Sequence, residues 1–364
     1  MKKSLAILGI LGLLAPFGTT ASPSWQNTSP NLPASVLDAH VNLPYFSFSV
    51  SRGNDWLVGN TNQLFHVSAD TVLDLTPDLQ KFGFNNIRQV ATDGSGWLIV
   101  GDISTWQTKP DIAMHYDGKY WKNVSTAIRL LPHDEWIGEI TGKQGVWYFV
   151  TDKNIYLWHD ALSEPAKITL PGAFKEPRTS SISIHPVQYG WMLNFEQKNG
   201  PKSIYAGRDV IDRRFFFFDG QNFQEQTSAF GNLSNYSTIG SNGANILVMG
   251  AVINAKTVDY KAYLSNGKNI TDLSGHLKDL LPQNISPNSQ YFLTQSKITW
   301  SGESWIFTNT SNKMAFWNQS HKPKFLPDAP FNILGVGYGK HGTVLISGYK
   351  NTEPPSPALT LFKP

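Results

Sequence analysis

The stretch ATDGSGWLIVGD, residues 91–102, places Asp, Gly and Ser directly before a run of strand-forming residues. A glycine loop that cradles phosphate would open a helix, whereas Trp97 to Val100 favour a pleated strand. The stretch therefore predicts the turn and second strand of a β-hairpin, and Trp97 is expected to pack rather than to bind a ligand.

Six further segments share this plan: a polar turn that contains glycine, usually an aromatic or bulky apolar residue, and then a short apolar strand. They are SRGNDWLVGN (51–60), TGKQGVWYFVTD (141–152), VQYGWMLNF (187–195), GSNGANILVMG (240–250), WSGESWIFTN (300–309) and YGKHGTVLISG (338–348). An alternating strand precedes each copy, and these strands begin 40 to 55 residues apart, near Phe46, Ile87, Trp136, Ser181, Tyr236, Tyr291 and Phe331. This spacing is typical of a repeat of four short strands.

A second hairpin follows the motif in most copies. Residues 112–125, 214–228 and 261–275 each contain an apolar strand, an Asp-Gly or Asn-Gly pair and another strand. Such pairs are the preferred centres of two-residue hairpin turns, in which both positions have positive φ. The only helix that the sequence predicts is the short GHLKDLL at residues 275–281, so the chain is expected to be all-β.

Four-stranded repeats can stack as blades around an axis, which hides most sheet edges. We therefore expect a seven-bladed β-propeller of antiparallel blades. The last repeat supplies only three strands before the chain ends at Pro364. Residues 24–31 resemble the outer strands of other repeats, such as residues 119–128 and 269–277, and are expected to complete the seventh blade.

The turn-and-strand motif, followed by YDGKYWKNVS at residues 116–125, resembles the repeat of two-component-regulator-type propellers and, more loosely, of kelch and sialidase-like propellers. The resemblance covers nearly the whole chain but implies the architecture alone. The turn at residues 92–97 has the wrong offsets for a sialidase Asp box, and the Trp-Asp dipeptide of WD40 repeats is absent. No family-level function is therefore implied.

Residues 1–21 are typical of a secretory signal, with Lys2 and Lys3 before an apolar run and a cut expected after Ala21; the alternative is a retained membrane anchor. Residues 22–364 are expected to form one exported domain. The full chain has 30 basic and 27 acidic side chains, so without the two lysines it is near neutral and implies no nucleic-acid partner. Its lack of cysteine excludes disulfides, thiolate metal sites and a thiol nucleophile.

Tryptophans recur at equivalent positions of the repeat, which predicts packing between neighbouring sheets, because a ligand site would need different residues from each blade. These are Trp56, Trp97, Trp147, Trp191 and Trp305. The repeats also contain irregular loops, and insertions in short hairpins usually have a function. These loops are therefore the places to look for a site.

Residues 196–214 form the longest insertion and concentrate Arg and Asp. Such a cluster could clamp a carboxylate or a sugar acid, or its members could pair with one another on a solvated loop. Residues 102–111 form a second insertion on the same predicted face and contain Trp106, which either stacks on a ligand or packs under its own loop. The connection LLPHDEW brings His133, Asp134 and Glu135 towards that face, either for acid–base work or as exposed turn residues.

The sequence thus predicts an exported, non-catalytic, monomeric propeller that binds a protein or a carbohydrate, with no cofactor, metal or membrane span after signal cleavage. The expected ligand-binding residues are Trp106, Arg208, Arg213, Arg214 and His133. The alternative is a glycoside hydrolase or lyase for an acidic sugar, with Asp209, Asp212 or Glu135 as the acid or nucleophile and an arginine of the same set holding the sugar. A third alternative is a structural module of a cell-surface assembly.

Overall fold

The structure of the protein is a computed structural model, which describes the chain in several ranges. They are residues 24–27, 48–53, 55–68, 71–104, 110–160, 162–171, 179–197, 212–253, 258–280, 297–300, 304–308, 314–319, 322–325, 332–338, 344–350 and 356–363. The described strands form seven four-stranded sheets, paired antiparallel throughout.

Six of these sheets consist of four strands that follow one another along the chain, in the same order in the sheet as in the sequence. They are β2 (Phe48–Arg52), β3 (Asp55–Gly59), β4 (Leu64–Val67) and β5 (Val72–Asp74); β6 (Asn86–Thr92), β7 (Trp97–Asp102), β8 (Ile112–Tyr116) and β9 (Trp121–Asn123); β10 (Ile137–Lys143), β11 (Val146–Thr151), β12 (Ile155–Trp158) and β13 (Ala166–Ile168); β14 (Thr179–Val187), β15 (Gly190–Gln197), β16 (Asp212–Phe218) and β17 (Phe223–Glu225); β18 (Ser234–Ser241), β19 (Ile246–Ile253), β20 (Val258–Ser265) and β21 (Ile270–Asp272); and β22 (Lys297–Trp300), β23 (Trp305–Thr308), β24 (Met314–Trp317) and β25 (Lys324–Phe325).

The remaining sheet is composite, because its strands come from both ends of the chain. It contains β26 (Asn332–Tyr338), β27 (Val344–Lys350), β28 (Ser356–Lys363) and β1 (Ser24–Asn27), in the order β1-β28-β27-β26. In the register of β1 and β28, Trp25 lies opposite Phe362. The strand β1 is shorter than the predicted segment 24–31, whose last four residues lie outside the described ranges.

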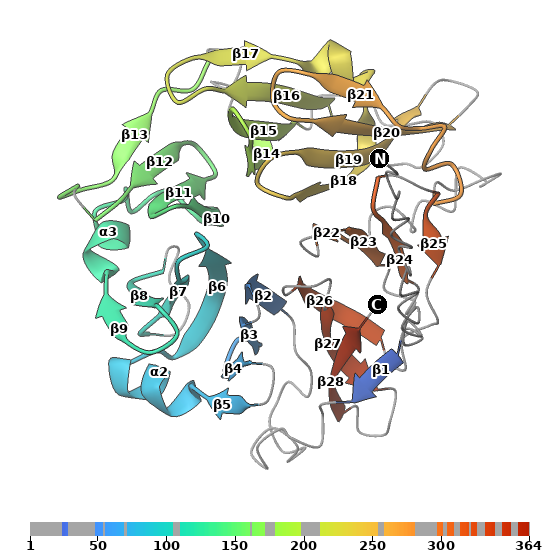
Figure 1. Cartoon of the computed structure of the whole chain (residues 1–364). Coiled ribbons are helices and arrows are strands. Elements are labelled where there is room, and N and C mark those ends of the chain that lie inside the picture. Colours follow the sequence, from blue (N-terminus) through green and yellow to red (C-terminus); the bar gives the residue numbers. More distant parts are fainter. Residues whose placement is uncertain are drawn as a thin grey trace, which may run out of the picture.

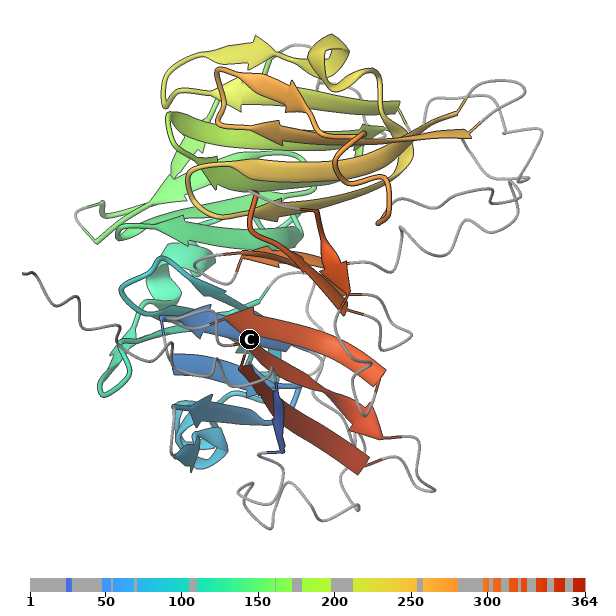
Figure 2. The same ribbon diagram turned by 45° about the vertical axis from the view of Figure 1, so that its right-hand side comes forward.

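The sheets stand around a common axis, with the first strand of each nearest to it (Figure 1). Each first strand contacts the first strand of the next sheet, from β2 through β6, β10, β14, β18 and β22 to β26, and β26 contacts β2. The 45° turn of Figure 2 shows β1 beside the C-terminal strands, at the edge of their sheet. Each sheet thus has one edge strand beside the axis and one short outer edge strand of two to four residues.

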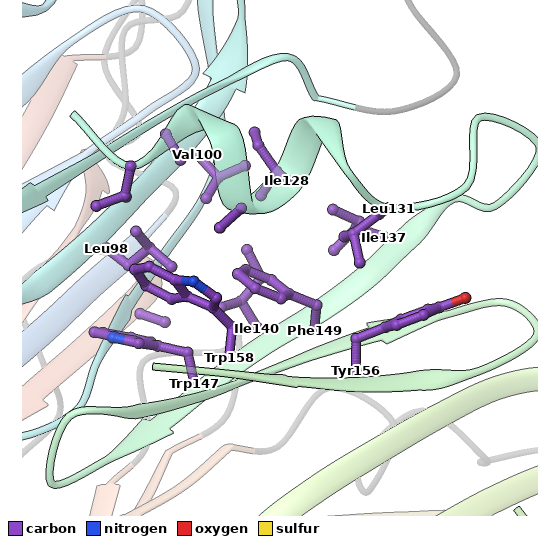
Figure 3. Close-up of a cluster of buried hydrophobic side chains, with 14 residues drawn as sticks. Leu98, Val100, Ile128, Leu131, Ile137, Ile140, Trp147, Phe149, Tyr156 and Trp158 are labelled. Carbon is purple, nitrogen blue, oxygen red and sulfur yellow. The ribbon is translucent and has the colours of Figure 1, made fainter. Parts of the chain in front are cut away.

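Large aromatic and aliphatic side chains fill the wedges between neighbouring sheets. The prediction that the repeat tryptophans are packing residues is confirmed, because Trp56, Trp97, Trp147, Trp191 and Trp305 are all 8% exposed or less. Between the sheets β6–β9 and β10–β13, Trp147 and Trp158 join a cluster with Leu98, Val100 and Phe149 (Figure 3). This packing holds in place the connection between the two sheets.

The prediction of a two-residue turn centred on Asp117 and Gly118 is wrong. In the hairpin of β8 and β9, Tyr116 pairs with Trp121, so four residues rather than two form the loop. The Oδ1 atom of Asp117 accepts hydrogen bonds from the backbone N–H groups of Lys119 and Tyr120, at 2.8 and 2.7 Å. Only Gly118 has a positive φ, of 100°. Aspartate therefore acts here through its side chain, which a two-residue turn does not need.

The expectation that residues 275–281 form the only helix is also wrong. Residues 274–280 form turns, and short helices occur instead at α2 (Thr76–Phe82), α3 (Ser125–Arg129) and the 3-10 helix η3 (Thr227–Phe230). In α2, a proline lies in the first turn and Gly83 ends the helix with φ of 92°. Among the described residues, no helix is long and apolar enough to span a bilayer. The predicted signal segment 1–21 lies outside those residues.

Candidate binding cavity

A cavity of about 860 Å³ lies where three consecutive sheets meet, β2–β5, β6–β9 and β10–β13. It is on the face that carries the connections into the first strands and the loops after the second strands. Its lining residues are Thr61, Asn62, Asn85, Asn86, Ile87, Arg88, Gln89, Asp102, Asp134, Glu135, Trp136, Ile137 and Asp152. Ten of these thirteen residues have polar side chains.

The connection between α3 and β10, residues 130–136, forms one side of the cavity. Leu131 and Ile137 flank its turn and are both buried in the core between the sheets (Figure 3). The backbone N–H of Glu135 donates to the carbonyl of Pro132, 3.4 Å away, which closes the turn. The segment between the two anchored residues is thereby held at the cavity.

Glu135 is only 5% exposed, and both oxygens of its carboxyl group accept hydrogen bonds. The hydroxyl of Thr151 donates to Oε2 at 2.5 Å, and Oε1 accepts from the amide of Asn154 at 2.6 Å and the hydroxyl of Tyr156 at 3.0 Å. These three donors come from the hairpin of β11 and β12. Glu135 therefore ties the connection to that hairpin.

Trp136 follows Glu135 and differs from the repeat tryptophans, because it is 59% exposed. Its backbone is fixed by Asp152: the N–H of Trp136 donates to Oδ1 of Asp152 at 2.9 Å, and the N–H of Asp152 donates to the carbonyl of Trp136 at 3.0 Å. An exposed indole and an exposed carboxyl group thus lie on adjoining, fixed backbone segments at the cavity.

The sheet β6–β9 supplies the opposite wall. Arg88, near the start of β6, forms an ion pair of 2.7 Å with Oδ2 of Asp102 at the end of β7. Asp102 is 1% exposed, and its Oδ1 atom has no hydrogen-bond partner among the described residues. The N–H of Ile87 donates to the carbonyl of Thr61 at 2.6 Å, which joins this wall to the turn between β3 and β4.

Four carboxyl groups and one guanidinium group line the cavity. The negative charge of Asp134 is compensated by Lys153, which does not line the cavity and whose Nζ lies 2.5 Å from Oδ2 of Asp134. This hydrogen bond to Lys153 holds the pKa of Asp134 below its usual value and raises the pKa of Lys153. Asp102 is paired with Arg88, so Glu135 and Asp152 are the lining carboxyl groups that have no ion pair among the described residues.

The predicted site residues lie in different places. Glu135 lines the cavity, whereas His133 is exposed and does not line it. Trp106, Arg208 and Asp209 fall outside the described residues. Their predicted roles therefore stay predictions.

Arg213 and Arg214 lie in β16 and do not line the cavity. Arg213 is 8% exposed and pairs across the strands with Glu196 of β15, with Nη2 2.5 Å from Oε1. Burial lowers the pKa of Arg213, and the charge and hydrogen bond of Glu196 oppose that effect. Arg214 is half-buried opposite Phe195, and Asp212 begins β16. The alternative in which an arginine pairs with an acidic residue therefore holds for Arg213. The pair lies inside a sheet and not on a solvated loop.

Sequence reasoning missed Trp136, which it treated as the start of a strand. The signal was nonetheless present, because Trp136 follows Asp134 and Glu135 rather than a glycine turn and so departs from the position of the repeat tryptophans. Within the ranges that the structure describes, no group of three or more His, Asp or Glu side chains could hold a metal ion.

No protein-family model matches the sequence, and no curated protein matches it. Among solved structures, the chain is similar to the Pyrococcus horikoshii acylaminoacyl peptidase, with a TM-score of 0.56 and 10% identity over 89% of this chain and 52% of that chain. It is also similar to YCF48 solved with a bound D1 peptide, with a TM-score of 0.48 and 14% identity over 91% and 98% of the two chains.

The WD40 propeller domain of Doa1 has a TM-score of 0.47 and 9% identity over 90% of this chain and 95% of that chain. Identities this low show the fold alone. The resemblance to two-component-regulator-type repeats stays a prediction. The topology of the sheets and the contacts between their first strands identify the chain as a β-propeller of four-stranded antiparallel blades.

Proposed function

We propose that the protein is an exported, non-catalytic binding module that holds a polypeptide partner in the cavity. The observation that carries the proposal is Trp136, a large aromatic side chain that is 59% exposed beside a cavity of about 860 Å³. Aromatic residues on fixed backbone are typical anchors of protein interfaces, because they bury a large area at low cost in entropy. The predicted signal at residues 1–21 is the basis for export.

The bonding of the acidic groups favours binding over catalysis. A general acid or base needs an oxygen that can reach a substrate proton, whereas both oxygens of Glu135 accept bonds from neighbouring side chains. Oδ2 of Asp102 is likewise engaged by Arg88. The excess of carboxyl groups also opposes an acidic sugar, the substrate of the enzymatic alternative.

A peptide-display experiment tests this proposal. The mature protein is used to select from a library of random heptapeptides and is applied in parallel to a glycan array. Selected peptides should bind the protein, and Trp136→Ala should weaken their binding about 10-fold or more, as expected for an interface anchor.

The matched control is Tyr120→Ala, because Tyr120 is an equally exposed aromatic at the turn between β8 and β9, outside the cavity lining. It should leave peptide binding unchanged. Failure to select any peptide, or glycan binding that Trp136→Ala abolishes, would overturn the polypeptide proposal. If Trp136→Ala and Tyr120→Ala weaken peptide binding equally, the cavity is not the binding site.

A further inference from the structure

We propose that the cavity recognises a cationic side chain, Arg or Lys, of the bound polypeptide; this inference rests on the proposed function. The cationic group would lie between Trp136 and Asp152 on one side and Asp102 on the other. The first argument is charge complementarity. The chain as a whole carries a formal net charge of +3, yet four carboxyl groups and a single guanidinium line this cavity. A cationic ligand is attracted to such a site, and an anionic one is repelled.

The second argument is the unpaired oxygen of Asp102. A buried polar atom normally has a hydrogen-bond partner, and one without a partner carries a desolvation cost. Asp102 is 1% exposed, its Oδ2 is engaged by Arg88, and its Oδ1 lacks a partner among the described residues. An N–H donor of a bound guanidinium or ammonium group would satisfy this atom. Such a charge-assisted bond is stronger than one between neutral groups.

The third argument is the pairing of an aromatic ring with a carboxyl group at the cavity. Two hydrogen bonds keep Trp136 and Asp152 together, one from the N–H of Trp136 to Oδ1 of Asp152 and one from the N–H of Asp152 to the carbonyl of Trp136, and both residues are exposed. A guanidinium group can stack on an aromatic face while it donates to a carboxylate at its edge.

The same chain already uses this combination elsewhere, at a site that is filled by one of its own residues. The guanidinium carbon of Arg52 lies 4.2 Å from the ring centroid of Trp97, and Nη2 is 3.4 Å from Oδ2 of Asp55. Arg52 also donates to the carbonyl of Ser95 at 2.8 Å. At the cavity, the arginine Arg88 is paired with Asp102, and no cation among the described residues stacks on Trp136, so that this place is left for a partner's side chain.

Synthetic heptapeptides with a variable central residue provide the probe. The central residue is Arg, Lys, citrulline, norleucine or Glu, and the flanking residues are taken from the best binder of the display experiment. Citrulline keeps the shape of Arg without its charge. We expect the Arg or Lys peptide to bind about 10-fold or more tightly than the citrulline and norleucine peptides. Binding should also weaken between 50 and 500 mM salt, on the order expected for partly exposed charges.

Two isosteric variants locate the interaction. Asp152→Asn removes the charge but keeps an oxygen that accepts from the N–H of Trp136, so the fold should persist. It should reduce the preference for Arg over citrulline about 3-fold or more, and Asp102→Asn should reduce it further. The matched control is Asp160→Asn, because Asp160 is exposed and pairs with Lys122 outside the cavity. Because Asp102→Asn also removes the partner of Arg88, the conclusion depends on Asp152→Asn.

The outcomes separate the two proposals. Equal binding of the Arg, citrulline and Glu peptides would overturn the cationic ligand and leave the polypeptide-binding module standing. An Arg preference that Asp160→Asn reduces as strongly as Asp152→Asn would overturn the proposed location. Absence of any peptide binding would overturn the proposed function itself.

Discussion

Glu135, in the connection before β10, and Arg213, in β16, are buried ionisable side chains that are stabilised in different ways. Glu135 accepts hydrogen bonds from three uncharged donors of one hairpin. Arg213 is balanced by the charge of Glu196 on the adjoining strand, 2.5 Å away. The first arrangement holds a connection at a cavity, and the second joins two strands inside a sheet. A buried ionisable residue can thus support a site or only the fold, depending on what pairs with it.

The largest expected effect is on the charge pair. Arg213→Ala should lower the free energy of unfolding by about 3–5 kcal/mol, because it leaves Glu196 largely buried without its cation. Urea denaturation of the purified variant measures the change. The double variant Arg213→Met with Glu196→Met should recover most of the loss. A double variant as unstable as Arg213→Ala would show that the pair is not the cause.

The next effect concerns the neutral donors. Glu135→Ala should lower the free energy of unfolding by about 2–3 kcal/mol, because Thr151, Asn154 and Tyr156 lose their shared acceptor. Glu135→Gln keeps one acceptor oxygen and should cost about 1 kcal/mol. The same denaturation series compares the two variants. Equal losses would mean that the negative charge, and not the hydrogen bonds, is what the hairpin requires.

Glu139 lies four residues after Glu135, and its carboxyl group accepts fewer hydrogen bonds than that of Glu135. Burial raises the pKa of Glu139 to about 8, and its one hydrogen bond, from the N–H of Ile184 at 3.3 Å, lowers it only in part. The folded state therefore favours the protonated carboxyl. Below about pH 4, Glu139 is protonated in both the folded and the unfolded chain and costs no stability. As pH rises to 8, the unfolded chain loses this proton and the folded chain keeps it, so the free energy of unfolding falls.

Glu139→Gln removes this loss. The variant should be more stable than the wild type by about 1–2 kcal/mol above pH 8, and the advantage should vanish near pH 4. Thermal unfolding of both proteins across this pH range measures the difference. Burial also lowers the pKa of His185 to about 4, so both proteins lose stability in acid and the comparison between them isolates Glu139. A constant difference at every pH would contradict the raised pKa.

The smallest effect on stability is expected at the exposed indole. Trp136→Ala should change the free energy of unfolding by no more than about 0.5 kcal/mol, because the side chain is 59% exposed and the backbone bonds to Asp152 remain. Denaturation measures stability, and the peptide assay measures binding. A large loss of stability would mean that the Trp136 side chain packs in the core, as that of Trp147 does.

Much of the fold follows from local patterns. The alternation of apolar residues and the recurrence of glycine turns predict the strands and the buried tryptophans, because both depend on residues close together in the chain. The turn type could not be read in this way. Asp117 caps its turn through side-chain bonds to Lys119 and Tyr120, and Asp-Gly is compatible with that geometry as well as with a two-residue turn.

The candidate site was predictable only in part. The cluster His133, Asp134 and Glu135 was singled out, and two of its members line the cavity. The role of Trp136 could not be deduced from spacing along the chain, since its exposure depends on where Leu131 and Ile137 anchor the connection. The pairing of Arg213 with Glu196 was likewise hidden, because it depends on the register of β15 and β16.

Local sequence patterns were sufficient to predict repeated antiparallel strands and a buried tryptophan at one position of the repeat. Periodicity and turn residues carry this information, because they act within a few residues. Only the tertiary structure decided that Thr61, Arg88, Asp102, Glu135 and Trp136 surround one cavity. These residues come from three sheets, and spacing along the chain does not specify which loops the packing of twisted sheets will bring together.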